Sequence, residues 1–322
     1  MVQKLNLKIR SGVFLLKRLN AKIKQLFHFY VTAALYLCIL ISLSACKTAV
    51  PVYEKVDVLS LLDNKSSFYL RIPTSVDSEQ FEKILQAKVK GLSEANARRI
   101  TERIDTIYIG LERTKKGTEY QLAASCNFPK VVIKSAFSKG NGWNSDSLVL
   151  DANDGKKSKY EIYERMGTLA SFPDTFTACT GYNVPSMIEK YHNIVTSQAD
   201  KNESLNNNVY DWLCYDNGIP DDNIKFFATR PQAFLSMLVG AQLNYQLNYV
   251  CGSICNDPKN NNQFIMEIQF DFINRRIIPA ARGALTLALG LTDAQVSSST
   301  ETNLTISNIK LNKKQLYQLL LL

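Results

Sequence analysis

Two long stretches of this chain alternate between apolar and polar residues, and this alternation constrains the fold more than any other feature. In the first stretch, Ile107 to Leu111 and Tyr120 to Phe128 carry an apolar residue at every second position, on either side of a turn around Gly117. In the second, Leu243 to Tyr249 and Met266 to Phe272 do the same. A period of two is typical of strands with one face on a core. Both stretches are therefore predicted to form hairpins of antiparallel sheets.

The elements around the two hairpins follow one order. The predicted strand Phe68–Ile72 stops at Pro73, and the predicted strand within Asn223–Arg230 stops at Pro231 in the same way. Helical patterns come before and after each hairpin, and the first gap holds two of them, at 77–89 and 93–104. Each copy thus has the order strand, helix, hairpin, helix, strand, which is that of a ferredoxin-like unit.

We therefore expect an α+β protein made of two tandem, related ferredoxin-like halves. The first half is predicted to span residues 58–200 and the second residues 209–322. In each half an antiparallel sheet is expected to carry its helices on one face.

The first 45 residues have a character of their own. They contain seven lysines and arginines and no acidic residue, and an apolar run follows from Phe29 to Ile41. A basic region, an apolar core and small residues before a cut are the three parts of a secretory signal. The apolar run is short for a permanent span, which needs about 20 apolar residues. Residues 1–45 are therefore predicted to be a leader, with an uncut signal anchor as the alternative.

The end of this leader resembles the lipobox of bacterial lipoproteins. Leu43, Ser44 and Ala45 come directly before Cys46. The resemblance implies that a diacylglycerol is attached to the Cys46 thiol, that the preceding bond is cut, and that acyl chains such as palmitate hold the new N-terminus to a membrane. Two or more acyl chains anchor firmly because each buried methylene contributes about 0.8 kcal/mol.

The leader and general make-up are similar to those of spirochaete-type envelope lipoproteins. This implies a place in the cell envelope, at the outer membrane or the periplasmic face of the inner membrane. Residues 46–57 are then expected to be a tether between the membrane and the folded body.

The net charge of +9 belongs mainly to the leader. Seven of the 38 basic residues lie there, so residues 46–322 carry 31 basic and 29 acidic residues, a net charge of +2. Nucleic-acid binding needs a basic surface on the folded domain. The composition therefore gives no reason to expect a nucleic-acid partner.

Five cysteines follow Cys46, an odd number that leaves at least one thiol unpaired. Cys251 and Cys255 are the candidate disulfide, because an exported protein can form such bonds and this pair would close a short loop. Cys126 falls on the apolar side of its strand and is predicted to be a small buried residue. A metal site is not expected, since His192 is the single histidine after the leader.

Enzyme motifs are missing from the sequence. His192 has no Gly-x-Ser-x-Gly partner, and no phosphate loop or dinucleotide fingerprint is present. The stretch Asp151–Gly155 resembles a calcium loop, but its twelfth position is Ile162 instead of glutamate. The protein is therefore predicted to be neither an enzyme nor the holder of a cofactor.

One apolar helix leaves a choice of functions open. The stretch Pro279–Leu291 is apolar nearly all round, which indicates either a buried helix or one that contacts lipid. The favoured hypothesis is an anchored envelope protein that binds a protein partner or has a structural role. The first alternative is a carrier of lipid or a small apolar ligand, and the second is an enzyme with dispersed acidic residues. The residues predicted to contact lipid in the carrier are Leu285, Leu287, Leu289 and Leu291.

Overall fold

The computed structural model describes a large part of the chain downstream of the predicted leader. Residues 1–54 and 55–322 form separate units, and the described residues all belong to the second. Leu43, Ser44, Ala45 and Cys46, and the tether as far as residue 55, lie outside the described residues. The described ranges are 56–88, 93–114, 117–152, 155–197, 205–215, 218–232, 234, 245–288, 295–297 and 302–320.

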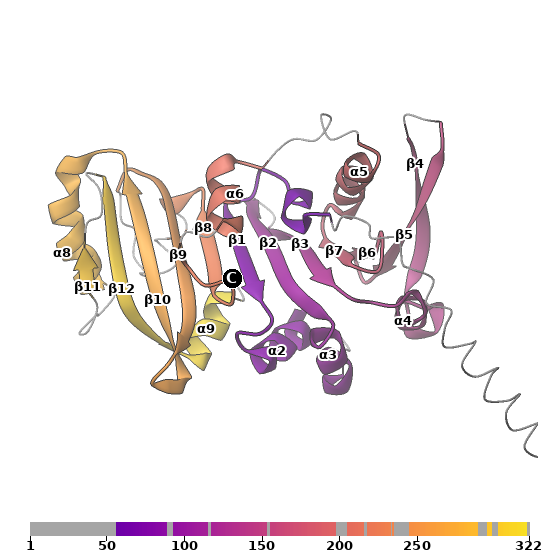
Figure 1. Ribbon diagram of the computed structural model, residues 1–322, viewed down its shortest axis with the longest axis horizontal. Helices are drawn as coiled ribbons and strands as arrows, with labels where there is room; N and C mark the ends of the chain where they lie inside the picture. Colours follow the sequence, from indigo (N-terminus) through magenta and orange to yellow (C-terminus); the bar gives the residue numbers. More distant parts are fainter. Residues whose placement is uncertain are drawn as a thin grey trace, which may run out of the picture. The chain divides into compact units, whose positions relative to one another are not determined.

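Within the described residues, twelve strands form one sheet in which all neighbouring strands are antiparallel (Figure 1). Their order across the sheet is β11-β12-β10-β9-β8-β1-β2-β3-β7-β6-β5-β4. The strands are β1 (Phe68–Pro73), β2 (Ile104–Thr114), β3 (Gly117–Cys126), β4 (Asn144–Asp151), β5 (Lys157–Arg165), β6 (Thr168–Ser171), β7 (Thr177–Gly181), β8 (Ile224–Ala228), β9 (Leu247–Asp257), β10 (Asn260–Phe272), β11 (Gln295–Ser297) and β12 (Asn303–Asn312).

Helices cover both faces of this sheet. Phe68, Leu70 and Ile72 of β1 belong to the core of the first face, and Tyr69 belongs to the core of the second. In Figure 1, α5 and α6 lie on the side of the sheet opposite to α2, α3 and α9. Helices that contribute to the first core are α2 (Ser78–Lys88), α4 (Lys130–Ala136), α8 (Ile278–Ala288) and α9 (Lys313–Leu320). Those of the second core are η1 (Val58–Leu61), α5 (Val184–Val195) and α6 (Asn207–Cys214). The remaining helices are α3 (Glu94–Thr101) and the short turns η2 (Lys139–Asn141) and η4 (Arg275–Ile277).

The prediction of two tandem ferredoxin-like halves with helices on one face is therefore wrong. The protein is α+β, but one continuous antiparallel sheet runs through both predicted halves. In a ferredoxin-like unit a single helix carries the chain across the sheet, so that the strands before and after it run parallel. Here β1 pairs directly with β2, and Pro73 at the end of β1 lies opposite Thr106 near the start of β2.

The connection between β1 and β2 explains this difference. It consists of α2 and α3, which pack against each other and so return the chain to the end of the sheet that it left. Ser93 begins α3, because its side chain accepts a hydrogen bond from the backbone N–H of Asn96 at 3.3 Å. Two helices in succession therefore impose the antiparallel pairing.

The two predicted halves meet in the middle of the sheet, where β1 pairs with β8. Leu70 lies opposite Phe226 and Tyr69 lies opposite Phe227. Every residue of both strands is buried. The internal repeat in the sequence thus corresponds to two runs of strands that join at β1 and β8 to build one sheet.

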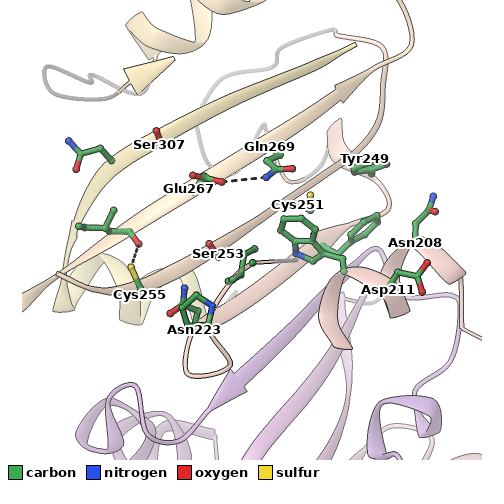
Figure 2. Close-up of a pocket in the computed structure, with 17 residues that line it drawn as sticks. Asn208, Asp211, Asn223, Tyr249, Cys251, Ser253, Cys255, Glu267, Gln269 and Ser307 are labelled. Carbon is green, nitrogen blue, oxygen red and sulfur yellow. Dashed lines mark hydrogen bonds between the residues drawn. The ribbon is translucent and has the colours of Figure 1, made fainter. Parts of the chain in front are cut away.

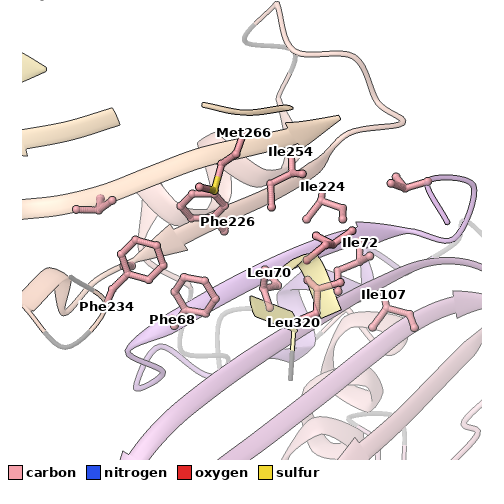
Figure 3. Close-up of a cluster of buried hydrophobic side chains, with 14 of the residues drawn as sticks. Phe68, Leu70, Ile72, Ile107, Ile224, Phe226, Phe234, Ile254, Met266 and Leu320 are labelled. Carbon is pink, nitrogen blue, oxygen red and sulfur yellow. The ribbon is translucent and has the colours of Figure 1, made fainter. Parts of the chain in front are cut away.

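Aromatic side chains fill the first core at this junction (Figure 3). The ring of Phe226 lies 6.0 Å from that of Phe68 and 5.5 Å from that of Phe234, measured between centroids. Leu320 of the C-terminal helix α9 belongs to the same core. The last helix packs against β10, β12 and α2, and its Leu316 and Leu320 are buried.

Candidate functional site

A concave pocket of about 730 Å³ lies on the second face of the sheet, beside α6 (Figure 2). Its floor comes from β8, β9, β10 and β12, and its walls come from α6 and the loop before β8. The residues that line it are Asn208, Asp211, Trp212, Gly218, Ile219, Pro220, Asn223, Phe227, Tyr249, Cys251, Ser253, Cys255, Ile265, Glu267, Gln269, Ser307 and Asn308.

The alternation of β9 and β10 builds the floor of the pocket. Ser253 lies opposite Glu267 and Cys251 lies opposite Gln269, so these four side chains share one face of the sheet. Figure 2 shows Ser253, Glu267 and Gln269 close to one another above the strands. The residues between them on both strands, such as Ile254 and Ile268, belong to the core of the opposite face. Burial of one face thus fixes which side chains reach the pocket.

Helix α6 forms a wall because it has one apolar stripe. Val209 and Leu213 are fully buried in the second core, four residues apart. Asp211 is exposed and Trp212 is half-buried, and both line the pocket. The side chain of Asn206 begins the helix by accepting a hydrogen bond from the N–H of Asn208 at 2.9 Å.

A buried arginine fixes the opposite wall, which is the loop before β8. Arg71 on β1 donates from Nη1 to the backbone carbonyl of Asp221 at 2.9 Å and from Nη2 to its carboxylate at 3.3 Å. The Asp221 side chain is 89 % exposed, so the bond to the carbonyl is the better shielded of the two. The loop that carries Pro220 and Asn223 is therefore tied to the centre of the sheet.

Several polar groups in the pocket have few partners within the described residues. The side chain of Asn223 is buried and makes no hydrogen bond there, although its backbone N–H bonds to the carbonyl of Pro220 at 3.1 Å. The Ser253 hydroxyl likewise has no partner in the described part of the chain. Gln269 donates to the Glu267 carboxylate over 3.4 Å, which is a long bond. These groups remain available to a bound molecule.

Cys251 and Cys255 do not form the predicted disulfide. Both cysteines are free, and both lie on β9, four residues apart. An extended strand rises about 3.3 Å per residue, so their Cα atoms are roughly 13 Å apart, about twice the reach of a disulfide. The sequence prediction of a closed loop was wrong because these residues belong to a strand.

The two thiols are poor nucleophiles in the folded protein. Burial raises the pKa of the Cys251 thiol well above its ordinary value, and the nearby Asp271 carboxylate adds to the effect. Burial also raises the pKa of Cys255, followed by the charge of Asp222. Since the thiolate is the reactive form, both side chains stay protonated near neutral pH.

Iodoacetamide is expected to label both Cys251 and Cys255 once the protein is unfolded without a reducing agent. The reason is that each thiol is free in the fold. Peptide mapping by mass spectrometry measures the label, and Cys179, which is also free and buried, serves as the reference. A peptide pair linked through Cys251 and Cys255, with no label on either, would contradict the structure.

The apolar helix that left the choice of functions open lies elsewhere. Ala281 and Leu285 of α8 are fully buried in the core of the first face, away from the lining of the pocket. Leu289 and Leu291 lie outside the described residues, and so does the side chain of Leu287. Of the four leucines predicted to contact lipid, the described one packs in the core.

The structure also places the other candidates for chemistry. His192 is buried on α5, with Nδ1 3.1 Å from the Tyr160 hydroxyl, and it does not line the pocket. The described residues contain no group of three or more side chains arranged to hold a metal ion. In the same part of the chain, no helix combines the length and apolar character that crossing a bilayer requires.

Comparisons with known proteins now bear on the whole fold. Residues 53–317 match the family model described as "Outer membrane-associated lipoprotein TP0453". Crystal form I of TP0453, a spirochaete lipoprotein, matches with a TM-score of 0.63 and 16% sequence identity, over 83% of this chain and 97% of that chain. Crystal form III matches with a TM-score of 0.59 and 17% identity, over 83% and 99%. No curated protein matches. The structural likeness shows a shared fold.

Proposed function

This chain belongs to the TP0453 family of outer membrane-associated lipoproteins, and from that membership we propose that it is anchored through Cys46 and binds a polar ligand without catalysing a reaction. The resemblance to spirochaete-type envelope lipoproteins seen in the leader is confirmed by the family. The family places the chain in the cell envelope. Beyond family membership and a place in the envelope, we propose that the chain has a leader, that Cys46 is lipidated and that the folded body binds a ligand.

The pocket beside α6 is the observation that carries the binding role. Ser253, Glu267 and Gln269, which form the floor of the open concavity, belong to neither hydrophobic core, so they are not needed for core packing. Its volume of about 730 Å³ lies within the usual range of ligand sites. A polar floor favours a polar ligand over the apolar one expected for a lipid carrier. Leu285, which the carrier hypothesis requires to contact lipid, packs in the other core.

The same pocket gives an enzyme with acidic residues one supporting observation, because Asp211 and Glu267 both line it. A carboxyl group that acts as a general acid near neutral pH is normally removed from water. Asp211 is exposed and Glu267 is half-exposed. The thiols of the pocket, Cys251 and Cys255, are held protonated. Binding is therefore the function that the geometry supports best.

Replacing Cys46 by alanine is expected to abolish both the lipidation and the cut that removes the leader. The wild-type protein should partition into the detergent-rich phase, with an intact mass that starts at residue 46 and includes a diacylglycerol. The variant should keep its leader and lose the lipid mass, since no thiol remains at that position. Intact-mass spectrometry of both proteins measures this.

Cys38→Ala is the matched control, because Cys38 is the other cysteine of the leader region. It should leave processing and lipid mass unchanged. A wild-type chain found unprocessed and without lipid would mean an uncut signal anchor and would overturn the proposed lipidation.

A further inference from the structure

The hydrogen-bonding groups of the pocket form an ordered array on three neighbouring strands. Asn223 comes directly before β8, Ser253 lies on β9, and Glu267 and Gln269 lie on β10. The buried amide of Asn223 offers both a donor and an acceptor that the described residues leave unused. A ligand that both donates and accepts several hydrogen bonds would satisfy this array.

The charge of the pocket selects against anionic ligands. Among the described residues, its lining includes the carboxylates of Asp211 and Glu267 and no lysine or arginine. Lys225 on β8, which is fully buried, lies opposite Ser253 and donates to the backbone carbonyl of Tyr215 at 3.1 Å. Phosphates and sulfates are normally bound by arginine, lysine or clustered backbone N–H groups. Neutral or cationic ligands fit this lining.

Aromatic rings flank the polar floor. Phe227 and Tyr249 stack with their centroids 5.0 Å apart and line the pocket together with Trp212. Tyr249 and Trp212 are half-buried, so part of each ring faces solvent. Tyrosine and tryptophan side chains combine a large apolar surface with a polar group. They suit a ligand whose ring faces are apolar and whose edges are polar.

We propose that this pocket binds a saccharide that is neutral or carries an amine. Sugar hydroxyl groups both donate and accept, so they can bond to the amide of Asn223, the hydroxyl of Ser253 and the carboxylate of Glu267. The C–H face of a sugar ring can pack on Trp212 or Tyr249. The inference rests on the proposed binding role and names the class of ligand for that same site.

Ligand binding can be measured through the fluorescence of Trp212, because the whole chain has only two tryptophans. The other, Trp143, is buried beside Phe137 with ring centroids 4.6 Å apart and does not line the pocket. In full-length lipidated protein with Trp143→Phe, fluorescence therefore reports on Trp212 alone. The protein is kept in a detergent without a sugar headgroup. The probes are the tetramer of N-acetylglucosamine, its de-acetylated cationic form and a sulfated heparin tetrasaccharide.

The neutral or the cationic tetramer is expected to change the fluorescence of Trp212 in a saturable way. Asn223→Ala and Glu267→Gln should each weaken that binding about tenfold, the usual effect of losing one or two hydrogen bonds. Glu119→Gln is the matched control, since Glu119 is a half-exposed carboxylate on β3, outside the pocket. Its affinity should equal that of the unaltered protein.

Alkylation of Cys255 gives a second readout that does not depend on tryptophan. Cys255 lines the pocket and is partly accessible. Bound tetramer should slow its reaction with iodoacetamide, and the reaction of Cys214, which does not line the pocket, should be unchanged. Protection of Cys255 that is lost in Glu267→Gln would support the saccharide site.

Three outcomes would overturn the inference. Tightest binding of the heparin tetrasaccharide would refute the charge argument. Binding of a tetramer that is unaffected by both Asn223→Ala and Glu267→Gln would place the sugar elsewhere. If no sugar changed the fluorescence of Trp212, saccharides would be excluded as ligands of this site. A change of Trp212 fluorescence on adding free amino acids or short peptides would then still support the proposed binding role. If no polar probe changed the fluorescence of Trp212, the proposed binding role would be refuted as well.

Discussion

Replacing Gly181 by alanine is expected to lower the free energy of unfolding by about 3 kcal/mol or more, because strain and overpacking act together. Gly181 has a φ of 131°, in a region that side chains rarely adopt. Its pairing with Gln121 of β3 would also bring an added Cβ into the backbone carbonyl of Tyr120. Backbone atoms in the middle of a sheet cannot move aside, so neither term is relieved.

Gly167→Ala separates the two causes. Gly167 also has a positive φ, of 79°, but no atom lies within 4 Å of an added Cβ. This variant should lose only about 1 kcal/mol from backbone strain. Urea unfolding followed by circular dichroism measures both variants. Equal losses at the two sites would show that contact with Tyr120 contributes nothing.

Replacing Phe226 by alanine is expected to cost about 3–5 kcal/mol, as for other fully buried phenylalanines. Its ring is completely buried where β1 meets β8, between Phe68 and Phe234. The cavity would open at the junction that joins both runs of strands. The loss should therefore destabilise the whole sheet, and Trp143 and Trp212 should report a single transition at lower urea concentration.

Tyr215→Ala is the control for removing an aromatic ring of similar size. Tyr215 is 59% exposed, and the contact it gives to Lys225 comes from its backbone carbonyl, which alanine keeps. Its loss should stay within about 0.5 kcal/mol, as for most surface substitutions. If Phe226→Ala instead produced two separate transitions, the two runs of strands would be independent domains.

The strands were the part of the fold that the sequence could predict. The alternation of Ile107–Leu111 and Tyr120–Phe128 gives β2 and β3, and Met266–Phe272 lies within β10. Periodicity determines which face of a strand is buried. It does not determine which strands become neighbours, so the assignment to two ferredoxin-like sheets failed at that step.

Two details of the sequence point to the observed architecture. Phe68–Leu70 and Phe226–Ala228 are apolar at consecutive positions, which is typical of strands covered on both faces and situated inside a sheet. The gap before β2 contained two predicted helices, which return a chain to the end of the sheet it left. Together they favour one antiparallel sheet with helices on both faces.

The sequence did not predict the pocket because it did not predict helix α6, which forms one wall of it. Helix α6 is eight residues long, and its apolar stripe consists of Val209 and Leu213, too little for a helical period to stand out. The alternation in Met266–Phe272 places Glu267 and Gln269 on the face opposite the first core, but the prediction of helices on one face of each sheet left that face uncovered. Only the tertiary position of α6 converts it into a concavity.

The pairing of β1 with β8 also determines how the chain must close on itself during folding. Most neighbours in the sheet are joined by short loops or helices and can pair locally. Arg71 and Asp221, in contrast, are 150 residues apart. Closing so long a loop carries an entropic cost that grows only slowly with length, but it delays non-local contacts relative to local ones. The wall of the pocket held by Arg71 is thus completed only when the two ends of that loop have met.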